Sequence, residues 1–248
     1  MNVEIKYLPS GDSALVMEFG NSINKEINAS IAQVVNTLKE EENEGIVDIL
    51  PTYRSILINY DPGVYTFDQL KNKLDSIEIT DRNLENDTVR LVKIPTLYGG
   101  EYGPDIKNVA DNAGLSEQEV IDIHSGVDYL VYMMGFLPGF TYLGGLDERI
   151  ATPRLSSPRV KIEPGSVGIA GTQTGMYPIV SPGGWQLIGR TPVKLYDPDR
   201  KEPVFINAGD YIRYVSVDED EYQKILDEVN NNTYVVEIEE VKRGDLRG

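Results

Sequence analysis

The first 80 residues show two kinds of apolar pattern, one typical of strands and the other of helices. Residues 22–42 and 66–77 place apolar side chains at helical spacing, and Thr66 is expected to cap the second helix. The stretches that alternate apolar and polar residues, and are therefore predicted as strands, are residues 3–8, 13–19, 46–53 and 55–60. This order of elements predicts a small α/β sandwich with helices covering one face of its sheet.

The second half begins with a long apolar stretch and two helical patterns. Residues 88–98 are predicted as a strand. Pro104 is expected at the first position of a short helix that stops at Gly114. A capping-box pattern at Ser116 then begins another helix, which ends at Gly126.

Short apolar stretches at even spacing follow, and this spacing is typical of an antiparallel barrel. Those predicted as strands are residues 128–134, 166–170, 177–181, 185–190 and 193–196, and residues 204–217 are predicted to add one or two more. After them, residues 218–229 predict a helix and residues 233–240 a last strand or an extended tail. The final residues 242–248 are expected to be frayed.

A polar linker at residues 81–87 divides the chain into two expected domains, residues 1–85 and 86–248. The absence of cysteine excludes disulfides and thiolate metal sites, and no metal site is predicted. A net charge of −17 disfavours nucleic acid and anionic membrane surfaces as partners. Because there is no signal-peptide pattern and no apolar run near the ~20 residues that span a bilayer, a cytoplasmic protein without a membrane partner is expected.

The segment 135–192 departs from the rest of the chain in composition and charge. Its 58 residues hold 11 of the 23 glycines, 7 of the 14 prolines and the single tryptophan, Trp185. Aromatic and branched residues are interleaved with the glycines, so the segment can bury apolar surface and is expected to fold. It carries a charge of +2 in a strongly acidic chain. We therefore expect an anionic ligand here.

Several residues are candidates for chemistry, each with a structural alternative. His124 is the single histidine and suits either a general base or phosphate contact, or a contact with carbonyls at a helix end. Gln173 and Thr174 lie in a glycine- and hydroxyl-rich loop that suits either an anion nest or tight hairpins. Trp185 follows Gly183 and Gly184 and would either wall a pocket or plug the barrel.

The basic residues of this segment also have two interpretations. Arg190 follows a glycine at the end of a predicted strand, which suits either a carboxylate or phosphate contact or a surface ion pair. Arg154, Arg159 and Lys161 lie on a proline-stiffened stretch that suits phosphate capture, docking of an acidic partner, or a solvated face. Common motifs such as the phosphate-binding loop GxxxxGK[ST], GxGxxG, HExxH and GxSxG are absent from the sequence.

Four stretches carry a resemblance to a known family. They are SGDSALVMEFG (10–20), IPTLYGGEYGPDIKNVA (94–110), GFLPGFTYLGGLDERI (135–150) and PRVKIEPGSVGIAGTQTGMYPIVSPGGWQLIGRTP (158–192). Together they resemble the allophanate hydrolase subunit 1 family, whose bacterial members include the B subunit of 5-oxoprolinase and a sporulation sensor-kinase inhibitor. The resemblance covers residues 1–240.

The resemblance implies an α+β fold, with a small N-terminal α/β sandwich followed by a cyclophilin-like closed β-barrel. It implies a non-autonomous enzyme subunit that cleaves 5-oxo-L-proline to L-glutamate with ATP. The implied partners are the A subunit of the same enzyme and its homologous C subunit, which is similar to allophanate hydrolase subunit 2. Two alternatives stay open. One is an inhibitor that binds a sensor histidine kinase, and the other is a subunit of an allophanate hydrolase or urea carboxyltransferase.

The resemblance also suggests residues for the site, by their position in the matching stretches. His124 and Arg190 are expected to be catalytic, with His124 handling a proton and Arg190 holding anionic oxygen. The expected substrate-binding residues are Gln173, Thr174, Gly183, Gly184 and Trp185. A valine at Gly184 is expected to damage the fold if that residue has a positive φ.

Overall fold

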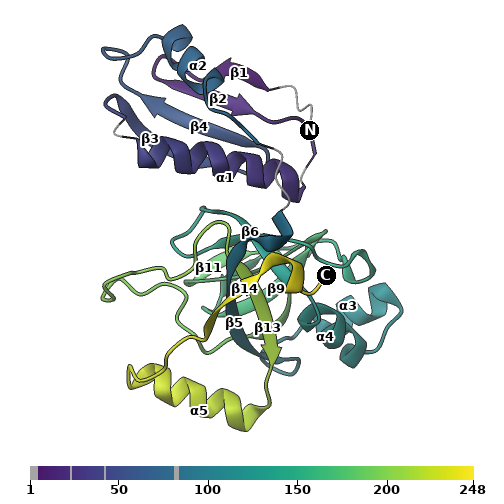
Figure 1. Ribbon diagram of the computed structural model, residues 1–248. Helices are drawn as coiled ribbons and strands as arrows, with labels where there is room; N and C mark the ends of the chain where they lie inside the picture. The colour runs from purple at the N-terminus through teal and green to yellow at the C-terminus, as the bar shows by residue number, and fades with distance from the viewer. Residues whose placement is uncertain (1–4, 23, 42, 81–83) are drawn as a thin grey trace. The chain divides into compact units, whose positions relative to one another are not determined.

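The computed structural model describes residues 5–22, 24–41, 43–80 and 84–248 (Figure 1). The chain divides into two compact units, residues 1–83 and 84–248, and each is described by itself. The division falls within the predicted polar linker, of which residues 81–83 lie outside the described residues.

The N-terminal unit is an antiparallel four-stranded sheet with two helices packed on one face. The strands follow the order β1-β2-β4-β3. The elements are β1 (Lys6–Pro9), β2 (Ala14–Glu18), α1 (Lys25–Glu40), β3 (Ile46–Pro51), β4 (Ser55–Tyr60) and α2 (Phe67–Asp75). Leu15 and Ile58 project from the sheet into the same core as Ile31 of α1 and Leu70 of α2. This single core explains why the central strands β2 and β4 bury one face and each helix buries one stripe.

Local capping fixes where both helices begin. Asn24 precedes α1 and accepts a hydrogen bond from the backbone N–H of Ile27 at 2.7 Å. Thr66 and Gln69 form a reciprocal capping box at the start of α2, which confirms Thr66 as its cap. The predicted bounds of the first helix, 22–42, exceed the observed ones by a few residues, and residues 23 and 42 lie outside the described part.

The C-terminal unit is built on an eight-stranded sheet that nearly closes into a barrel (Figure 1). The strand order is β10-β9-β12-β5-β13-β6-β7, with β14 also paired to β5, and the end strands β7 and β10 pack against each other. Its strands are β5 (Thr88–Tyr98), β6 (Asp128–Met134), β7 (Thr141–Gly144), β9 (Ser166–Ala170), β10 (Gln173–Met176), β12 (Gln186–Arg190), β13 (Tyr211–Ser216) and β14 (Ile238–Lys242). The predicted fold class, an α/β sandwich followed by a barrel, is confirmed.

The remaining elements lie around this sheet. The unit has three helices: α3 (Ile106–Ala113), α4 (Glu117–Ser125) and α5 (Glu219–Asn230). A short antiparallel pair consists of β8 (Arg159–Ile162) and β11 (Ser181–Gly183). There are also three 3-10 turns: η1 (Leu84–Asn86), η2 (Glu148–Ile150) and η3 (Arg243–Asp245). Gly114 ends α3 in a left-handed conformation, and Ser116 forms the predicted capping box of α4. None of the helices that the structure describes has the length and apolar character needed to cross a membrane.

The barrel differs from the predicted antiparallel arrangement at one pair of strands. β13 runs parallel to β5, with Tyr211 opposite Leu91 and Ser216 opposite Thr96. The two parallel strands are not consecutive in the chain, because residues 99–210, which include strands β6 to β12, lie between β5 and β13. Even strand spacing therefore did not reveal the direction of this strand.

Two predicted strands and one predicted helix start are wrong. Residues 177–180 form a loop, where Pro178 lacks the N–H that a strand ladder requires, and residues 193–196 contribute one isolated bridge, from Tyr196 to Val204. Helix α3 begins at Ile106 with Asp105 as its N-terminal flanking residue, so Pro104 lies before the helix.

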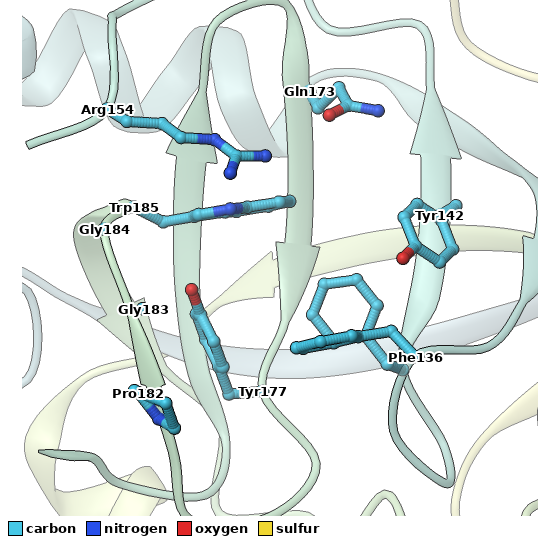
Figure 2. A pocket seen from close by; sticks show the side chains of 10 residues that line it. Phe136, Tyr142, Arg154, Gln173, Tyr177, Pro182, Gly183, Gly184 and Trp185 are labelled. Atoms are coloured by element: carbon cyan, nitrogen blue, oxygen red, sulfur yellow. The ribbon is translucent and has the colours of Figure 1, made fainter. Parts of the chain in front are cut away.

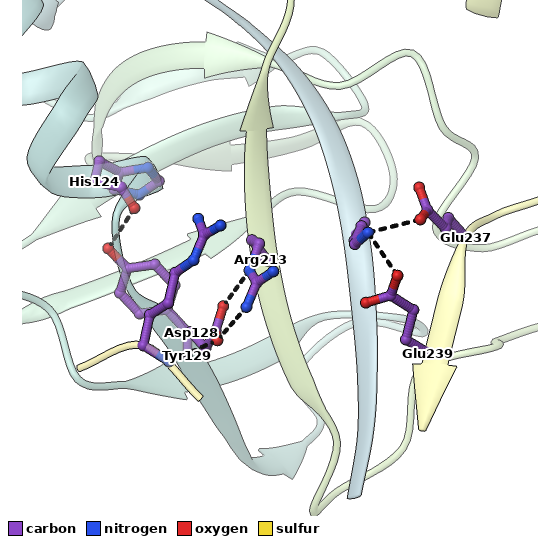
Figure 3. Close-up of polar contacts among 8 residues, drawn as sticks. His124, Asp128, Tyr129, Arg213, Glu237 and Glu239 are labelled. Carbon is purple, nitrogen blue, oxygen red and sulfur yellow. Dashed lines mark hydrogen bonds and ion pairs between the residues drawn. The ribbon is translucent and has the colours of Figure 1, made fainter. Parts of the chain in front are cut away.

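The C-terminal end is held in place, contrary to the expectation that it frays. The buried carboxylate of Asp128 accepts hydrogen bonds from Arg213 Nε and Nη2, both at 2.7 Å, and from the backbone N–H of Arg247 at 2.9 Å (Figure 3). The backbone N–H of Asp128 in turn donates to the carbonyl of Arg247 at 2.9 Å. The polar sequence of residues 242–248 predicted fraying, but the buried carboxylate of Asp128 binds the backbone of Arg247 and holds this segment.

Candidate functional site

An open pocket on the barrel is walled mainly by aromatic side chains (Figure 2). The cavity measures about 250 Å³. Its lining residues are Phe136, Phe140, Tyr142, Arg154, Gln173, Tyr177, Pro182, Gly183, Gly184 and Trp185. The indole of Trp185 meets the rings of Phe140 and Tyr177 edge-on, with centroids 5.9 and 6.1 Å apart. Such edge-to-face contacts fix the walls of the pocket.

Several strands of the C-terminal unit bring these residues together. Tyr142 lies on β7, Gln173 begins β10, Gly183 ends β11, and Trp185 immediately precedes β12. In the view of Figure 2, Arg154 and Gln173 lie above the indole of Trp185 and Tyr177 lies below it. The segment rich in glycine and aromatic residues therefore folds into the walls of one cavity.

Two glycines allow these walls to approach each other. A Cβ at Gly175 would lie 3.2 Å from Cζ3 of Trp185, so the missing side chain lets the indole rest against β10. A Cβ at Gly183 would collide with the Tyr177 hydroxyl and lie 2.8 Å from Cδ1 of Ile162. Gly184, by contrast, has no positive φ and would give a Cβ ordinary contacts of 3.6 Å, so the condition attached to the valine prediction is not met.

Arg154 alone carries a charge among the ten residues that line the pocket. Its guanidinium carbon lies 6.0 Å from the centroid of the Trp185 ring, a cation–π arrangement. Within the described part of the chain, Arg154 forms no ion pair. Its two basic neighbours in sequence do: Arg159 binds the buried carboxylate of Asp105 at 2.7 Å, and Lys161 pairs with Glu163 at 2.6 Å. The structure thus separates three cations that the sequence left equivalent.

Tyr177, one of the two tyrosines in the pocket wall, stays neutral at physiological pH. Burial raises the pKa of Tyr177 to about 12, although the nearby charges of Arg154 and Arg159 act in the opposite direction. The Tyr177 ring is almost fully buried. Arg154 is therefore the group that gives the pocket its charge.

His124 lies inside the barrel, without exposure to solvent. Its Nδ1 is 2.8 Å from the Tyr98 hydroxyl and its Nε2 is 2.7 Å from Thr174 Oγ1. The Thr174 hydroxyl has one proton, which it donates to the carbonyl of Gly168 at 3.1 Å, so its oxygen accepts from Nε2–H. In the neutral ring, Nδ1 is then the acceptor for Tyr98.

Burial lowers the pKa of His124 to about 3, so the ring is neutral at physiological pH. Burial also raises the pKa of Tyr98 well above its usual range, which keeps its hydroxyl a donor. His124 does not line the aromatic pocket. Its predicted role in proton transfer stays a prediction, and what the structure shows is a hydrogen-bond link to Thr174, the neighbour of Gln173 in β10.

Arg190 lies in a different place from the other candidates. It lines a separate groove of about 680 Å³, together with residues of α5 such as Tyr222. Its guanidinium carbon is 5.6 Å from the centroid of the Tyr102 ring. The predicted catalytic role of Arg190 stays a prediction.

The structure therefore groups four of the seven predicted site residues in the aromatic pocket: Gln173, Gly183, Gly184 and Trp185. Thr174 lies in β10 but does not line the pocket, and its hydroxyl binds His124. Arg190 lines a separate groove. Sequence reasoning did not assign a site role to the other aromatic walls, Phe136, Phe140, Tyr142 and Tyr177. The available signal was the concentration of aromatic residues among the glycines of segment 135–192.

Comparison with known proteins gives a consistent family. The family model described as carboxyltransferase domain, subdomain C and D, matches residues 5–206. A curated 5-oxoprolinase B subunit from Bacillus subtilis is 41% identical over 242 residues, which covers 93% of this chain and 100% of that protein. A urea amidolyase from Saccharomyces cerevisiae is 26% identical over 96% of this chain but only 15% of its own length.

A solved structure shares the fold. The crystal structure of the Kluyveromyces lactis urea carboxylase superimposes with a TM-score of 0.79 at 21% identity, over 96% of this chain and 24% of that chain. At this identity the match concerns the fold alone. The family match and the full-length relative are decisive: the chain belongs to the carboxyltransferase-domain family, subdomains C and D, together with the 5-oxoprolinase B subunits that it resembles.

Proposed function

We propose that this chain is the B subunit of a 5-oxoprolinase and takes part in the cleavage of 5-oxo-L-proline to L-glutamate. The observation that carries the proposal is the 41% identity to a curated B subunit over that protein's entire length. The aromatic pocket supports it, since a concave apolar site with a few polar groups suits a small organic ligand.

The proposed reaction explains why ATP and partner subunits would be needed. The lactam of 5-oxoproline is an unstrained amide, and phosphorylation of its oxygen would create a good leaving group before water attacks. The residues of the aromatic pocket do not suit ATP, because a triphosphate carries several negative charges and the pocket would offer it a single arginine. We therefore place ATP elsewhere in a complex with the A and C subunits, and we place the complex in the cytoplasm.

The test is to purify this chain with its partner subunits and measure phosphate release stimulated by 5-oxoproline. We expect stimulation in the full complex and none when any one subunit is left out. An assembled complex that releases no phosphate in response to 5-oxoproline would refute the proposal.

The similarity to urea amidolyase supports a second candidate, a carboxyltransferase component acting on urea or a related amide. This chain corresponds to 15% of that yeast protein, so the second activity would depend on other domains, including a biotin carrier. Replacing 5-oxoproline with urea or allophanate in the same assay separates the two candidates. Inhibition of a sensor histidine kinase stays a prediction.

A further inference from the structure

We propose that the aromatic pocket binds a small cyclic amide bearing a carboxylate, and that Arg154 holds the carboxylate. This inference deepens the proposed function and rests on it for the identity of the ligand, 5-oxoproline. The structure provides the chemical class, through the charge, the walls and the size of the pocket.

The charge of the pocket selects an anion. The chain has a net charge of −17, so an anionic ligand approaches against a general repulsion. Arg154 reverses that field locally, because it is the one charged residue of the ten that line the pocket. An arginine also matches the geometry of a carboxylate with two parallel N–H donors. Arg159 and Lys161 cannot take this role as easily, since each already binds a carboxylate of its own.

The walls select a flat, partly apolar body. Trp185, Phe140 and Tyr177 line the cavity as buried rings that meet one another edge to face. Arg154 lies over the Trp185 ring, so a carboxylate bound to its guanidinium would be attached to a body close to the indole (Figure 2). A five-membered lactam is flat enough to pack there, and its amide needs polar neighbours, of which Gln173 is one.

The size of the cavity favours a small ligand. Sites for drug-sized molecules measure roughly 300–1,000 Å³. The present cavity, at about 250 Å³, lies below that range. A ring of five atoms with one carboxylate fits such a volume better than a nucleotide does.

The position of the single tryptophan offers a direct measurement. Because Trp185 lines the pocket and the chain has no other tryptophan, its fluorescence reports on this cavity alone. The chain would be titrated with 5-oxo-L-proline and with 2-pyrrolidinone, the same lactam without a carboxylate. The variants are Arg154→Ala and the control Arg149→Ala, which removes an exposed arginine whose partner is Asp147. The same variants in the assembled complex would give KM and kcat for 5-oxoproline-dependent phosphate release.

We expect Arg154→Ala to weaken 5-oxoproline binding by about 10- to 100-fold, the loss of one charge-assisted pair, and to leave 2-pyrrolidinone binding unchanged. Arg149→Ala should bind both compounds as the wild type does. Equal 5-oxoproline affinity in wild type and Arg154→Ala, or no fluorescence response to 5-oxoproline at all, would overturn the inference.

The two readouts separate this inference from the proposed function. A complex that cleaves 5-oxoproline with the same KM in Arg154→Ala as in wild type would retain the function and refute the role of Arg154. The opposite result is a complex that does not cleave 5-oxoproline, while the Trp185 fluorescence of the chain responds to 5-oxoproline and loses this response in Arg154→Ala. That result would refute the proposed function and retain the binding site.

Discussion

Two groups of aromatic residues in the barrel unit each surround one basic side chain, and they differ in what that side chain binds. His124 packs against the rings of Tyr214 and Tyr129, with centroids 4.5 and 5.4 Å away, and both its ring nitrogens have hydrogen-bond partners within the barrel. Arg154 lies over Trp185 at the mouth of an open pocket, without an ion pair among the described residues.

The difference separates a polar group that is hydrogen-bonded within the protein from one that we propose binds a ligand. A buried polar group must find partners inside the protein, and His124 does so at the cost of its ability to take up a proton. An arginine in an open aromatic pocket keeps its donors for something outside the chain. A single histidine attracts attention in a sequence, yet here the less conspicuous arginine has the better geometry for a ligand.

The largest expected effect is on the closed group. His124→Leu would leave the Tyr98 hydroxyl and the Thr174 oxygen without their partner, so we expect the free energy of unfolding to fall by about 2–5 kcal/mol in urea denaturation. Arg154→Ala, the matched change in the open group, should alter it by less than about 0.5 kcal/mol. Equal losses in the two variants would remove the distinction between the groups.

A second comparison uses adjacent glycines of the pocket. Gly183→Ala places a methyl group against the Tyr177 hydroxyl and Ile162, so we expect a loss of about 1–3 kcal/mol in stability and a changed Trp185 emission. Gly184→Ala has room for its methyl group and serves as the control. If Gly183→Ala has the emission spectrum and the stability of the wild type, then Tyr177 and Ile162 do not lie as close to residue 183 as described.

The pH dependence of stability offers a third test of the closed group. The unfolded chain takes up a proton at His124 near pH 6.5, whereas the folded chain does so near 3. The unfolded state therefore binds more protons between these values, and the free energy of unfolding falls as the pH drops through this window, by up to about 1.4 kcal/mol per pH unit. Above pH 6.5 the contribution is constant.

The comparison is best made between pH 7 and 5.5, above the usual range of most carboxylates. His124→Asn should lose the part of the slope that belongs to this residue. If His124→Asn keeps the wild-type dependence of unfolding free energy on pH, that dependence belongs to other groups. Such a result would contradict a buried, neutral His124 imidazole.

The smallest expected effect concerns the rim of the open pocket. Phe136 has a φ of 66°, in the left-handed region that favours glycine. Its side chain is 72% exposed. Phe136→Gly relieves this strain but raises the entropy of the unfolded chain, so stability should change by no more than about 1 kcal/mol. Affinity for 5-oxoproline should fall about two- to tenfold if the ring covers the ligand. An unchanged affinity would place Phe136 outside the binding site.

Local patterns predicted most of the fold because the signals lie within a few residues of one another. Thr66 and Ser116 cap their helices through the residue three positions later, and residues 88–98 form one strand with the predicted bounds. Strands β7 and β10 were missed because they have four residues each and include glycine. The parallel pairing of β13 joins it to β5, which lies more than 100 residues earlier in the chain, and strand spacing does not encode such a distant pairing.

The site was harder to predict because its meaning depends on distant partners. His124 is bound by residues 26 and 50 positions away, and Arg159 by Asp105, 54 positions away. Without those contacts, the three cations between residues 154 and 161 are equivalent. Composition located the right segment, but it could not tell that Arg159 and Lys161 each bind a carboxylate whereas Arg154 lines the pocket.

The most direct test of this account is the KM for 5-oxoproline of the complex assembled with wild-type chain and with Arg154→Ala. We expect the variant to assemble normally and to show a KM raised by about tenfold or more. An unchanged KM in a normally assembled, active complex would contradict the claim that the open pocket holds the substrate through Arg154.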